Sequence, residues 1–181
     1  MRSLTLFALI ALFGAGTAAG ADFTIRRLAP SAFPQLPPSI RQTLEQRDCL
    51  VPQLWEGWNS KPHNVIRGAF LRKKQIDWAV LCSIAGRSTI LVFPRGASQP
   101  AAELAAADDE NFVQEVMPGR PGFSRAIGAV GRKHILEFYE AYGGPKPPPM
   151  DHQGINDAFV EKASGVHYFY KGEWLELSGA D

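Results

Sequence analysis

Two apolar runs near the middle of the chain, residues 64–71 and 76–83, carry the clearest periodic pattern. Both are rich in β-branched and aromatic residues, and the polar segment Arg72-Lys73-Lys74-Gln75 separates them. Apolar runs of this length joined by a short polar segment are typical of a β-hairpin. The pattern therefore predicts a hairpin in which Leu71 faces Ile76.

Both faces of this hairpin are apolar. Because alternate side chains of a strand point to opposite faces, one face carries Val65, Ala69, Trp78, Val80 and Cys82, and the other carries Ile66, Phe70, Ala79 and Leu81. A third run, 88–93, follows a glycine-containing turn at 84–87. These runs predict an antiparallel three-stranded meander that is buried on both sides.

The end of the chain has the pattern of a second hairpin. Residues 166–170 and 173–177 are joined by Lys171-Gly172, a dipeptide suited to a two-residue turn. In this register Phe169 lies opposite Trp174, and His167 lies opposite Glu176, on one face. The other face carries Val166, Tyr168, Leu175 and Leu177.

Other segments predict short helices and further strands. A capping box of Ser39 and Gln42 predicts a helix over 39–47, with Ile40 and Leu44 on its apolar side. The alanine-rich segment 100–107 predicts a short helix, and the acidic residues 108–110 open the segment that follows it. Strands are predicted at 112–117 and 125–130, whereas 133–139 fits either a strand or a helix. The fold class is therefore α+β, with a mainly antiparallel sheet and a few short helices.

The amino-terminal segment differs from the rest of the chain. Residues 1–21 contain one charge, Arg2, an apolar block at 4–13 and the small residues Ala19-Gly20-Ala21. This is the pattern of a cleaved signal peptide, since the apolar block is too short to span a membrane. We therefore expect a periplasmic or extracellular protein without a membrane anchor after cleavage, with a proline-rich lead-in at 22–38 and one domain at 39–181.

Export changes the interpretation of the two cysteines. In an oxidising compartment Cys49 and Cys82 form a candidate disulfide. A redox-active pair usually has a Cys-x-x-Cys spacing, which is absent here. We therefore predict a structural disulfide between these two residues.

Charge and motifs exclude several functions. The chain has 19 Lys+Arg against 18 Asp+Glu, so it lacks the basic surplus of a non-specific nucleic-acid binder. It also has no Gly-x-Ser-x-Gly, His-Glu-x-x-His or phosphate-binding glycine motif. The sequence thus points to no cofactor and to no nucleic-acid partner.

Aromatic residues gather at the carboxyl-terminal hairpin and suggest a ligand site. Tyr168, Phe169, Tyr170 and Trp174, with His167 and Glu176 as polar neighbours, would form a stacking platform for a sugar or a peptide if they were exposed. The alternative is that these rings pack in the core, as cross-strand aromatic pairs commonly do.

The polar segment 151–157 suggests a cation site. Asp151, His152 and Asp157 offer oxygen and imidazole ligands around Gly154. The alternative is a loop in which the Asp and Asn side chains bond their own backbone.

Part of the central hairpin resembles a known repeat. Gly68-Ala69-Phe70, a polar turn and Asp77-Trp78-Ala79-Val80-Leu81 resemble one FG-GAP repeat of integrin-like propellers. The basic turn replaces the acidic calcium-binding turn of that repeat, and only one repeat is found, so neither a propeller nor calcium is implied. The order of leader, Cys49-Leu50-Val51-Pro52, the Asp77–Cys82 strand and the closing hairpin is similar to small exported bacterial proteins of unassigned function.

These observations lead to one functional expectation and one alternative. We expect an exported, non-catalytic binding or inhibitor-like domain with a protein or saccharide partner, because a rigid sheet with proline-rich loops suits recognition. The alternative is a small periplasmic hydrolase that uses His152 or His167 with Asp151, Asp157 or Glu176.

Overall fold

The computed structural model describes residues 23–57 and 61–179. The predicted signal peptide, residues 1–21, lies outside these ranges. Strands take up 43% and helices 19% of the described residues, so the fold is mainly β. The predicted antiparallel sheet, few short helices and single disulfide are confirmed. Within the described ranges, no helix has the length and apolar character needed to cross a membrane.

Two four-stranded antiparallel sheets form the framework. The first sheet has the order β3-β4-β5-β6 and consists of β3 (Val65–Gly68), β4 (Asp77–Ile84), β5 (Arg87–Phe93) and β6 (Ala102–Asp108). The second sheet has the order β12-β11-β10-β9 and consists of β9 (Arg125–Val130), β10 (Gly154–Phe159), β11 (Ala163–Tyr170) and β12 (Glu173–Ser178). Short pairs and helices complete the fold: β1 (Arg27–Leu28) with β2 (Val51–Pro52), β7 (Val113–Met117) with β8 (Arg120–Phe123), α1 (Pro38–Gln46), α2 (Arg132–Tyr142), and the 3-10 turns η1 (Pro30–Ala32), η2 (Pro94–Gly96) and η3 (Asp109–Phe112).

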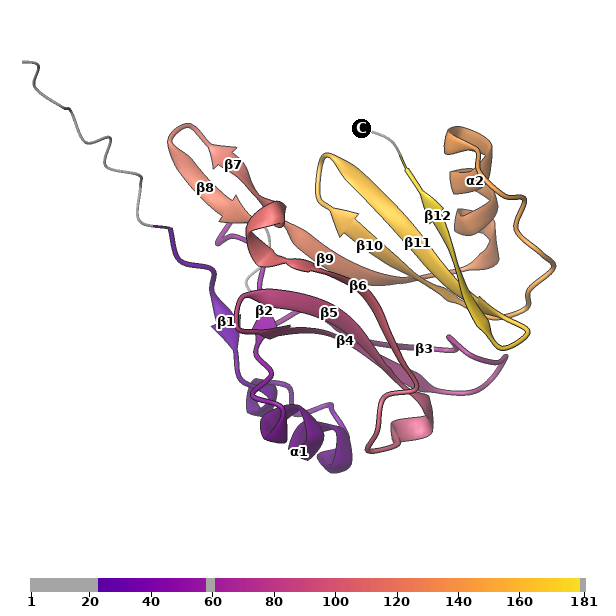
Figure 1. Ribbon diagram of the computed structural model, residues 1–181, viewed down its shortest axis with the longest axis horizontal. Coiled ribbons are helices and arrows are strands. Elements are labelled where there is room, and N and C mark those ends of the chain that lie inside the picture. Colours follow the sequence, from indigo (N-terminus) through magenta and orange to yellow (C-terminus); the bar gives the residue numbers. More distant parts are fainter. Residues whose placement is uncertain (1–22, 58–60, 180–181) are drawn as a thin grey trace, which may run out of the picture.

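The elements stack in four layers, α1, first sheet, second sheet and α2 (Figure 1). Ile40 and Leu44 of α1 pack on the first sheet together with Val80 and the disulfide. The opposite face of that sheet packs on the second sheet, and α2 covers part of the second sheet's outer face. The first sheet is therefore covered on both sides, as the doubly apolar pattern of its strands requires.

A fully buried arginine joins the two sheets. Arg125 of β9 donates from Nε and Nη2 to both carboxylate oxygens of Asp157, at 2.9 and 2.7 Å. Its Nη1 donates to the carbonyl and the hydroxyl of Ser88, and its Nη2 also donates to the Ala105 carbonyl. The Phe112 ring lies 4.4 Å from the guanidinium carbon. All five N–H groups of the side chain thus have partners, which is the condition for burying a guanidinium.

The central hairpin confirms the predicted faces with a different register. Val65 pairs with Val80 and Gly68 with Asp77, two positions away from the expected pairing, so each side chain keeps its face. β3 ends at Gly68, and the connection to β4 is longer than the four polar residues suggested. β5 and the closing β11–β12 hairpin are confirmed, including Phe169 opposite Trp174.

Two helix predictions need correction. The alanine-rich segment predicted as a helix at 100–107 forms strand β6, because the edge of β5 supplies hydrogen-bond partners that outweigh the helix propensity of alanine. The helix at 38–46 is confirmed, but its capping box is wrong: Pro37 is the N-cap, and the Ser39 hydroxyl donates to the Gly96 carbonyl.

One ambiguous segment forms the helix on the second sheet, and one missed strand lies within that sheet. Residues 133–139 belong to helix α2, so the helical alternative is the correct one. β10 begins at Gly154, inside the segment interpreted as a polar loop, and it forms the centre of the sheet between β9 and β11. The acidic residues Asp109 and Glu110 open η3, as predicted.

The disulfide generates a stability prediction. Cys49 follows α1, Cys82 lies in β4, and their Cα atoms are 5.4 Å apart. Their separation of 33 residues corresponds to about 3.7 kcal/mol of loop-closure entropy in the unfolded chain. We expect the double variant Cys49→Ala/Cys82→Ala to lose about that much free energy of unfolding in a urea titration. An unchanged unfolding midpoint would contradict this role.

Candidate functional site

A buried carboxylate organises one end of the molecule. Asp77, at the start of β4, is completely buried. Its Oδ2 accepts from the backbone N–H groups of Phe70 and Leu71, both at 3.0 Å. Its Oδ1 accepts from Gln75 Nε2 at 2.6 Å and from the Arg95 backbone N–H at 3.2 Å. One side chain thereby fixes both the 69–76 connection and the η2 turn.

Gln75 connects the buried Asp77 to Arg95 through hydrogen bonds. While its amide N–H donates to Asp77, its Oε1 accepts from Arg95 Nε at 3.0 Å. Arg95 has a positive φ of 51°, a conformation that a non-glycine residue adopts at a cost. The hydrogen bonds of its backbone and side chain to Asp77 and Gln75 hold it there, with the guanidinium directed by a neutral acceptor.

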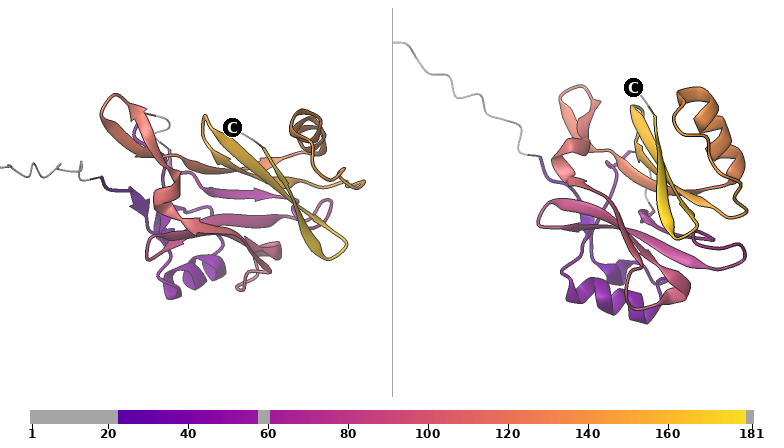
Figure 2. Two further views of the ribbon diagram at one scale, coloured as in Figure 1. Left: turned by 45° about the horizontal axis from the view of Figure 1, so that its top comes forward. Right: turned by 45° about the vertical axis from the view of Figure 1, so that its right-hand side comes forward.

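These residues line a groove that also reaches the carboxyl-terminal hairpin. We name it the basic groove; its volume is about 530 Å³ and it is lined by Leu71, Arg72, Gln75, Pro94, Arg95, Ala101, Phe169, Gly172 and Trp174. A neighbouring hollow shares Arg72, Gln75 and Arg95 and adds Lys73 and Lys74. The 69–76 connection and the β11–β12 turn lie at the same end of the molecule in each view (Figures 1 and 2). The predicted aromatic hairpin thus meets a basic loop far from it in sequence.

Two aromatic rings form one wall of the basic groove. Phe169 and Trp174 face each other across β11 and β12 with centroids 5.6 Å apart and planes at 61°. Both are half-buried, and Trp174 packs against the core between the sheets. The pair is therefore anchored in the core and still lines the groove, which combines the two interpretations of the sequence.

A histidine holds the hairpin in this position. His152 donates from Nε2 to the Phe169 carbonyl at 2.7 Å. Because a carbonyl oxygen only accepts, Nε2 carries the proton, and Nδ1 lies 3.6 Å from Asp151. His152 therefore supports the groove wall from outside the groove.

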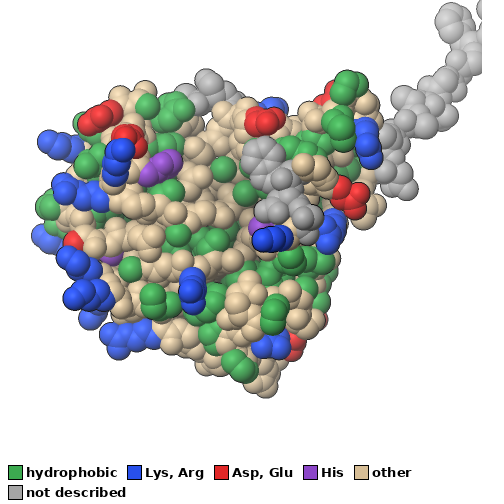
Figure 3. Space-filling model, turned by 180° about the vertical axis from the view of Figure 1, so that it is seen from behind, with side chains coloured by type: hydrophobic (Ala, Val, Ile, Leu, Met, Phe, Trp, Pro, Cys, Tyr) green, Lys and Arg blue, Asp and Glu red, His purple; other side chains and the backbone are tan. Residues whose placement is uncertain are grey.

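Positive charge gathers at this end of the molecule. Lysine and arginine side chains crowd the left edge in Figure 3, which is the end that carries the basic groove. Neither Arg72 nor Lys74 has an ion-pair or hydrogen-bond partner among the described side chains. Lys73 lies 3.8 Å from Asp151, and both groups are exposed. A chain with almost no net charge thus has a strongly basic end.

The remaining predicted aromatic residues lie elsewhere. Tyr168 points to the opposite face of the second sheet and is buried in the core beneath α2, so it is not accessible to a ligand. Tyr170 shares that face, and Lys171 Nζ lies 5.3 Å from its ring centroid. The predicted platform therefore reduces to Phe169 and Trp174, because alternate residues of a strand face opposite ways.

The structure brings His167 next to two carboxylates, but inside the fold. Its Nδ1 is 3.7 Å from Glu176, its Nε2 is 4.0 Å from Asp157, and the imidazole is only 6% exposed. Burial lowers the pKa of His167, and the two carboxylates oppose this effect while Arg125 adds to it. A buried imidazole that stays neutral at physiological pH is a packed polar group, not an accessible acid or base.

The three residues predicted as a metal site are not brought together. Asp151 is exposed near Lys73 and His152, whereas Asp157 lies in β10 and binds Arg125 with both oxygens. Among residues 23–57 and 61–179, no three His, Cys, Asp or Glu side chains form a group that could hold a metal ion. Asp157 lies in strand β10 and points into the interior, away from the exposed Asp151.

The sequence did not predict several residues that form or support the basic groove. The pattern places Asp77 in the apolar run 76–83 and Arg72 in the polar segment between two strands, and gives neither a role in a site. The sequence offers one signal in retrospect, a carboxylate at the start of an otherwise apolar strand. Arg95 had no signal, because its place depends on contacts with Gln75 and Asp77.

The chain matches no family model, no curated protein and no solved structure with which it was compared. The functional argument therefore depends on the geometry of the groove.

The role of Asp77 can be tested by removing its charge. The amide introduced by Asp77→Asn accepts hydrogen bonds at one oxygen only, and its NH₂ group faces two of the N–H donors that the carboxylate had accepted from. We therefore expect the free energy of unfolding to fall by about 3 kcal/mol. Asp108→Asn is the matched control: it breaks an exposed ion pair with Arg87 and should cost less than about 1 kcal/mol. Equal losses in urea titrations of the two variants would refute the organising role.

The buried His167 predicts a pH dependence of stability. Its pKa is lowered from 6.5 in the native state, so the unfolded chain binds the proton at higher pH. Its contribution is complete above about pH 6.5 and is lost as the pH falls below that value, with a slope of at most about 1.4 kcal/mol per pH unit. We expect the free energy of unfolding, measured by urea titration, to fall less between pH 7.5 and 5.5 in His167→Gln than in the parent chain.

His63 is the control for this measurement, because burial also lowers its pKa. A His63→Gln variant should remove a separate share of the same pH dependence. If His167→Gln keeps the full pH dependence of the parent, the imidazole is not buried in its neutral form.

Proposed function

We propose that this protein is an exported, non-catalytic binding domain whose basic groove binds an acidic saccharide. The observation that carries the proposal is that Arg72 and Arg95 line the same groove as the Phe169–Trp174 pair. An aromatic wall packs against the C–H face of a sugar ring, and guanidinium groups bind carboxylates in bidentate fashion. A ring that carries a carboxylate matches both features.

The groove is already organised for binding. Asp77 and Gln75 hold Arg95, while His152 holds the carbonyl of Phe169. Because these groups are fixed before a ligand arrives, less conformational entropy is lost on binding. The alternative partner is a protein segment rich in acidic residues. Binding such a segment would not require the two aromatic rings that line the groove.

The hydrolase alternative has weaker support. Its best candidate, His167 with Asp157 and Glu176, has converging groups, but the imidazole is 6% exposed and lies outside the basic groove. His152 has its Nε2 proton engaged with a backbone carbonyl. A general base must reach a bound substrate, and neither imidazole is placed to do so.

The proposal includes export of the protein from the cytoplasm. The leader pattern of residues 1–21 and the Cys49–Cys82 disulfide both support a periplasmic or extracellular location. Acidic polysaccharides and their fragments are accessible ligands outside the cytoplasm, whereas a cytosolic protein would keep its thiols reduced.

The groove can be tested by calorimetry on residues 22–181. Tetragalacturonate is the probe, and its fully methyl-esterified form is a matched ligand without charge. We expect saturable binding of the acid and at least tenfold weaker binding of the ester, since a charge-assisted hydrogen bond contributes about 1.5–3 kcal/mol. Arg95→Gln and Trp174→Leu should each weaken the binding of tetragalacturonate at least tenfold.

A lysine far from the groove provides the control variant. Lys133 on α2 is exposed and pairs only with Glu137 at 3.5 Å among the described residues, so Lys133→Gln removes one positive charge without touching the groove. Equal losses of affinity for tetragalacturonate in Lys133→Gln and Arg95→Gln would mean a general charge effect and would overturn the proposal. Tighter binding of tetraglutamate than of tetragalacturonate would replace the saccharide with an acidic protein segment.

A further inference from the structure

A second groove lies on the outer face of the second sheet, beyond the part that α2 covers. Strand alternation puts Ala126 and Gly128 of β9, Asn156 and Ala158 of β10, and Ser164 of β11 on this face. They line a groove of about 480 Å³ that we name the Asn156 groove. Large side chains on neighbouring positions, such as Val166, are covered by α2, so the uncovered part of the face consists of small residues.

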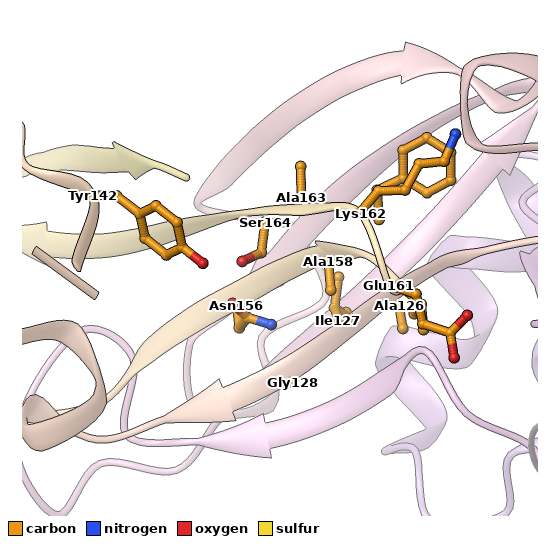
Figure 4. A pocket seen from close by; sticks show the side chains of 12 residues that line it. Ala126, Ile127, Gly128, Tyr142, Asn156, Ala158, Glu161, Lys162, Ala163 and Ser164 are labelled. Atoms are coloured by element: carbon orange, nitrogen blue, oxygen red, sulfur yellow. The ribbon is translucent and has the colours of Figure 1, made fainter. Parts of the chain in front are cut away.

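Three polar side chains converge in the Asn156 groove. Figure 4 shows Tyr142, from the end of α2, with its hydroxyl toward Ser164, and Asn156 on the neighbouring strand. Within the described chain, no hydrogen bond engages the Asn156 amide or either hydroxyl, and the buried Asn156 Oδ1 has no partner. A buried acceptor without a partner costs about 1–3 kcal/mol, and a turn of the Asn156 amide toward the groove would let a ligand donor satisfy it.

The chemistry of the groove differs from that of the basic groove. Its inner groups are an amide and two hydroxyls, which both donate and accept and carry no charge. Tyr142 is 53% exposed and stands at one end of the groove. The charged residues Glu161 and Lys162 lie at the other end of the groove (Figure 4). Their charges have opposite signs, so together they add no net charge to the groove.

We infer that the Asn156 groove is a second binding site, which takes a neutral hexopyranose unit. Vicinal sugar hydroxyls donate and accept as the amide and the two hydroxyls require, and the C–H face of the ring packs on an exposed tyrosine. The floor of alanine and glycine leaves the space for the ring. The two grooves lie on opposite faces of the second sheet and at opposite ends of β11, so this site does not depend on the acidic saccharide proposed for the other.

Gly128 provides a variant that blocks the groove without harming the fold. A Cβ atom built on Gly128 meets no atom within 4 Å, and its φ is that of an ordinary strand residue. A leucine there would occupy the groove, and it should also raise the melting temperature, because glycine weakens a strand. Ala129→Leu is the matched control, since Ala129 is exposed and is the next residue of β9, on the other face.

The test is saturation-transfer NMR and calorimetry on residues 22–181, with cellotetraose, maltotetraose and chitotetraose as probes. We expect saturable binding of at least one probe, a loss of at least tenfold in Gly128→Leu, a loss in Tyr142→Phe and Asn156→Ala, and no change in Ala129→Leu. Arg95→Gln should leave this binding intact, which separates it from the basic groove. The inference is overturned if none of the three probes binds, or if Gly128→Leu binds a probe as tightly as the parent.

Discussion

The bidentate ion pair between Arg125 and Asp157 is the constraint on which the arrangement of the two sheets depends. A guanidinium buried between sheets requires acceptors for all of its N–H groups, and these come from β5, β6 and β10. The carbonyl of Ala105 takes part because the backbone of β6 has a positive φ there, of 50°. Any sliding of one sheet over the other would leave at least one charge-bearing N–H unpaired. The polar centre thus fixes a position that the surrounding apolar contacts would leave adjustable.

The basic groove depends on that fixed position, whereas the Asn156 groove depends on the length of α2. The basic groove takes Arg72 and Arg95 from the connections of the first sheet, and Phe169 and Trp174 from the second sheet, so it exists only while the two sheets keep this relative position. The Asn156 groove exists because α2, with 11 residues, covers only part of the second sheet's outer face. Layering buries most of each sheet, and what remains uncovered is confined to two places of different chemistry.

The parts of the fold that sequence reasoning predicted are those with local causes. The two-residue turn at Lys171-Gly172 sets the register of β11 and β12, and the faces of the central hairpin follow from alternation alone. β6 and β10 could not be predicted, because alanine has no preference for a strand and the polar residues of β10 find partners in distant segments. The site was predicted in part, since Phe169 and Trp174 are neighbours across a hairpin. Arg95 was missed, because it meets them only through tertiary contacts.

The distribution of ion pairs explains how a nearly neutral chain can present a basic groove. Away from the groove, Arg27, Arg47 and Arg87 pair with Asp109, Glu103 and Asp108. At the groove, Arg95 is held by the neutral oxygen of Gln75, while the nearby carboxylate of Asp77 lies buried and accepts only from neutral N–H groups. Asp77 therefore positions the arginine without occupying its terminal nitrogens. Net charge describes the sum over the surface, whereas binding depends on which charges have already been paired.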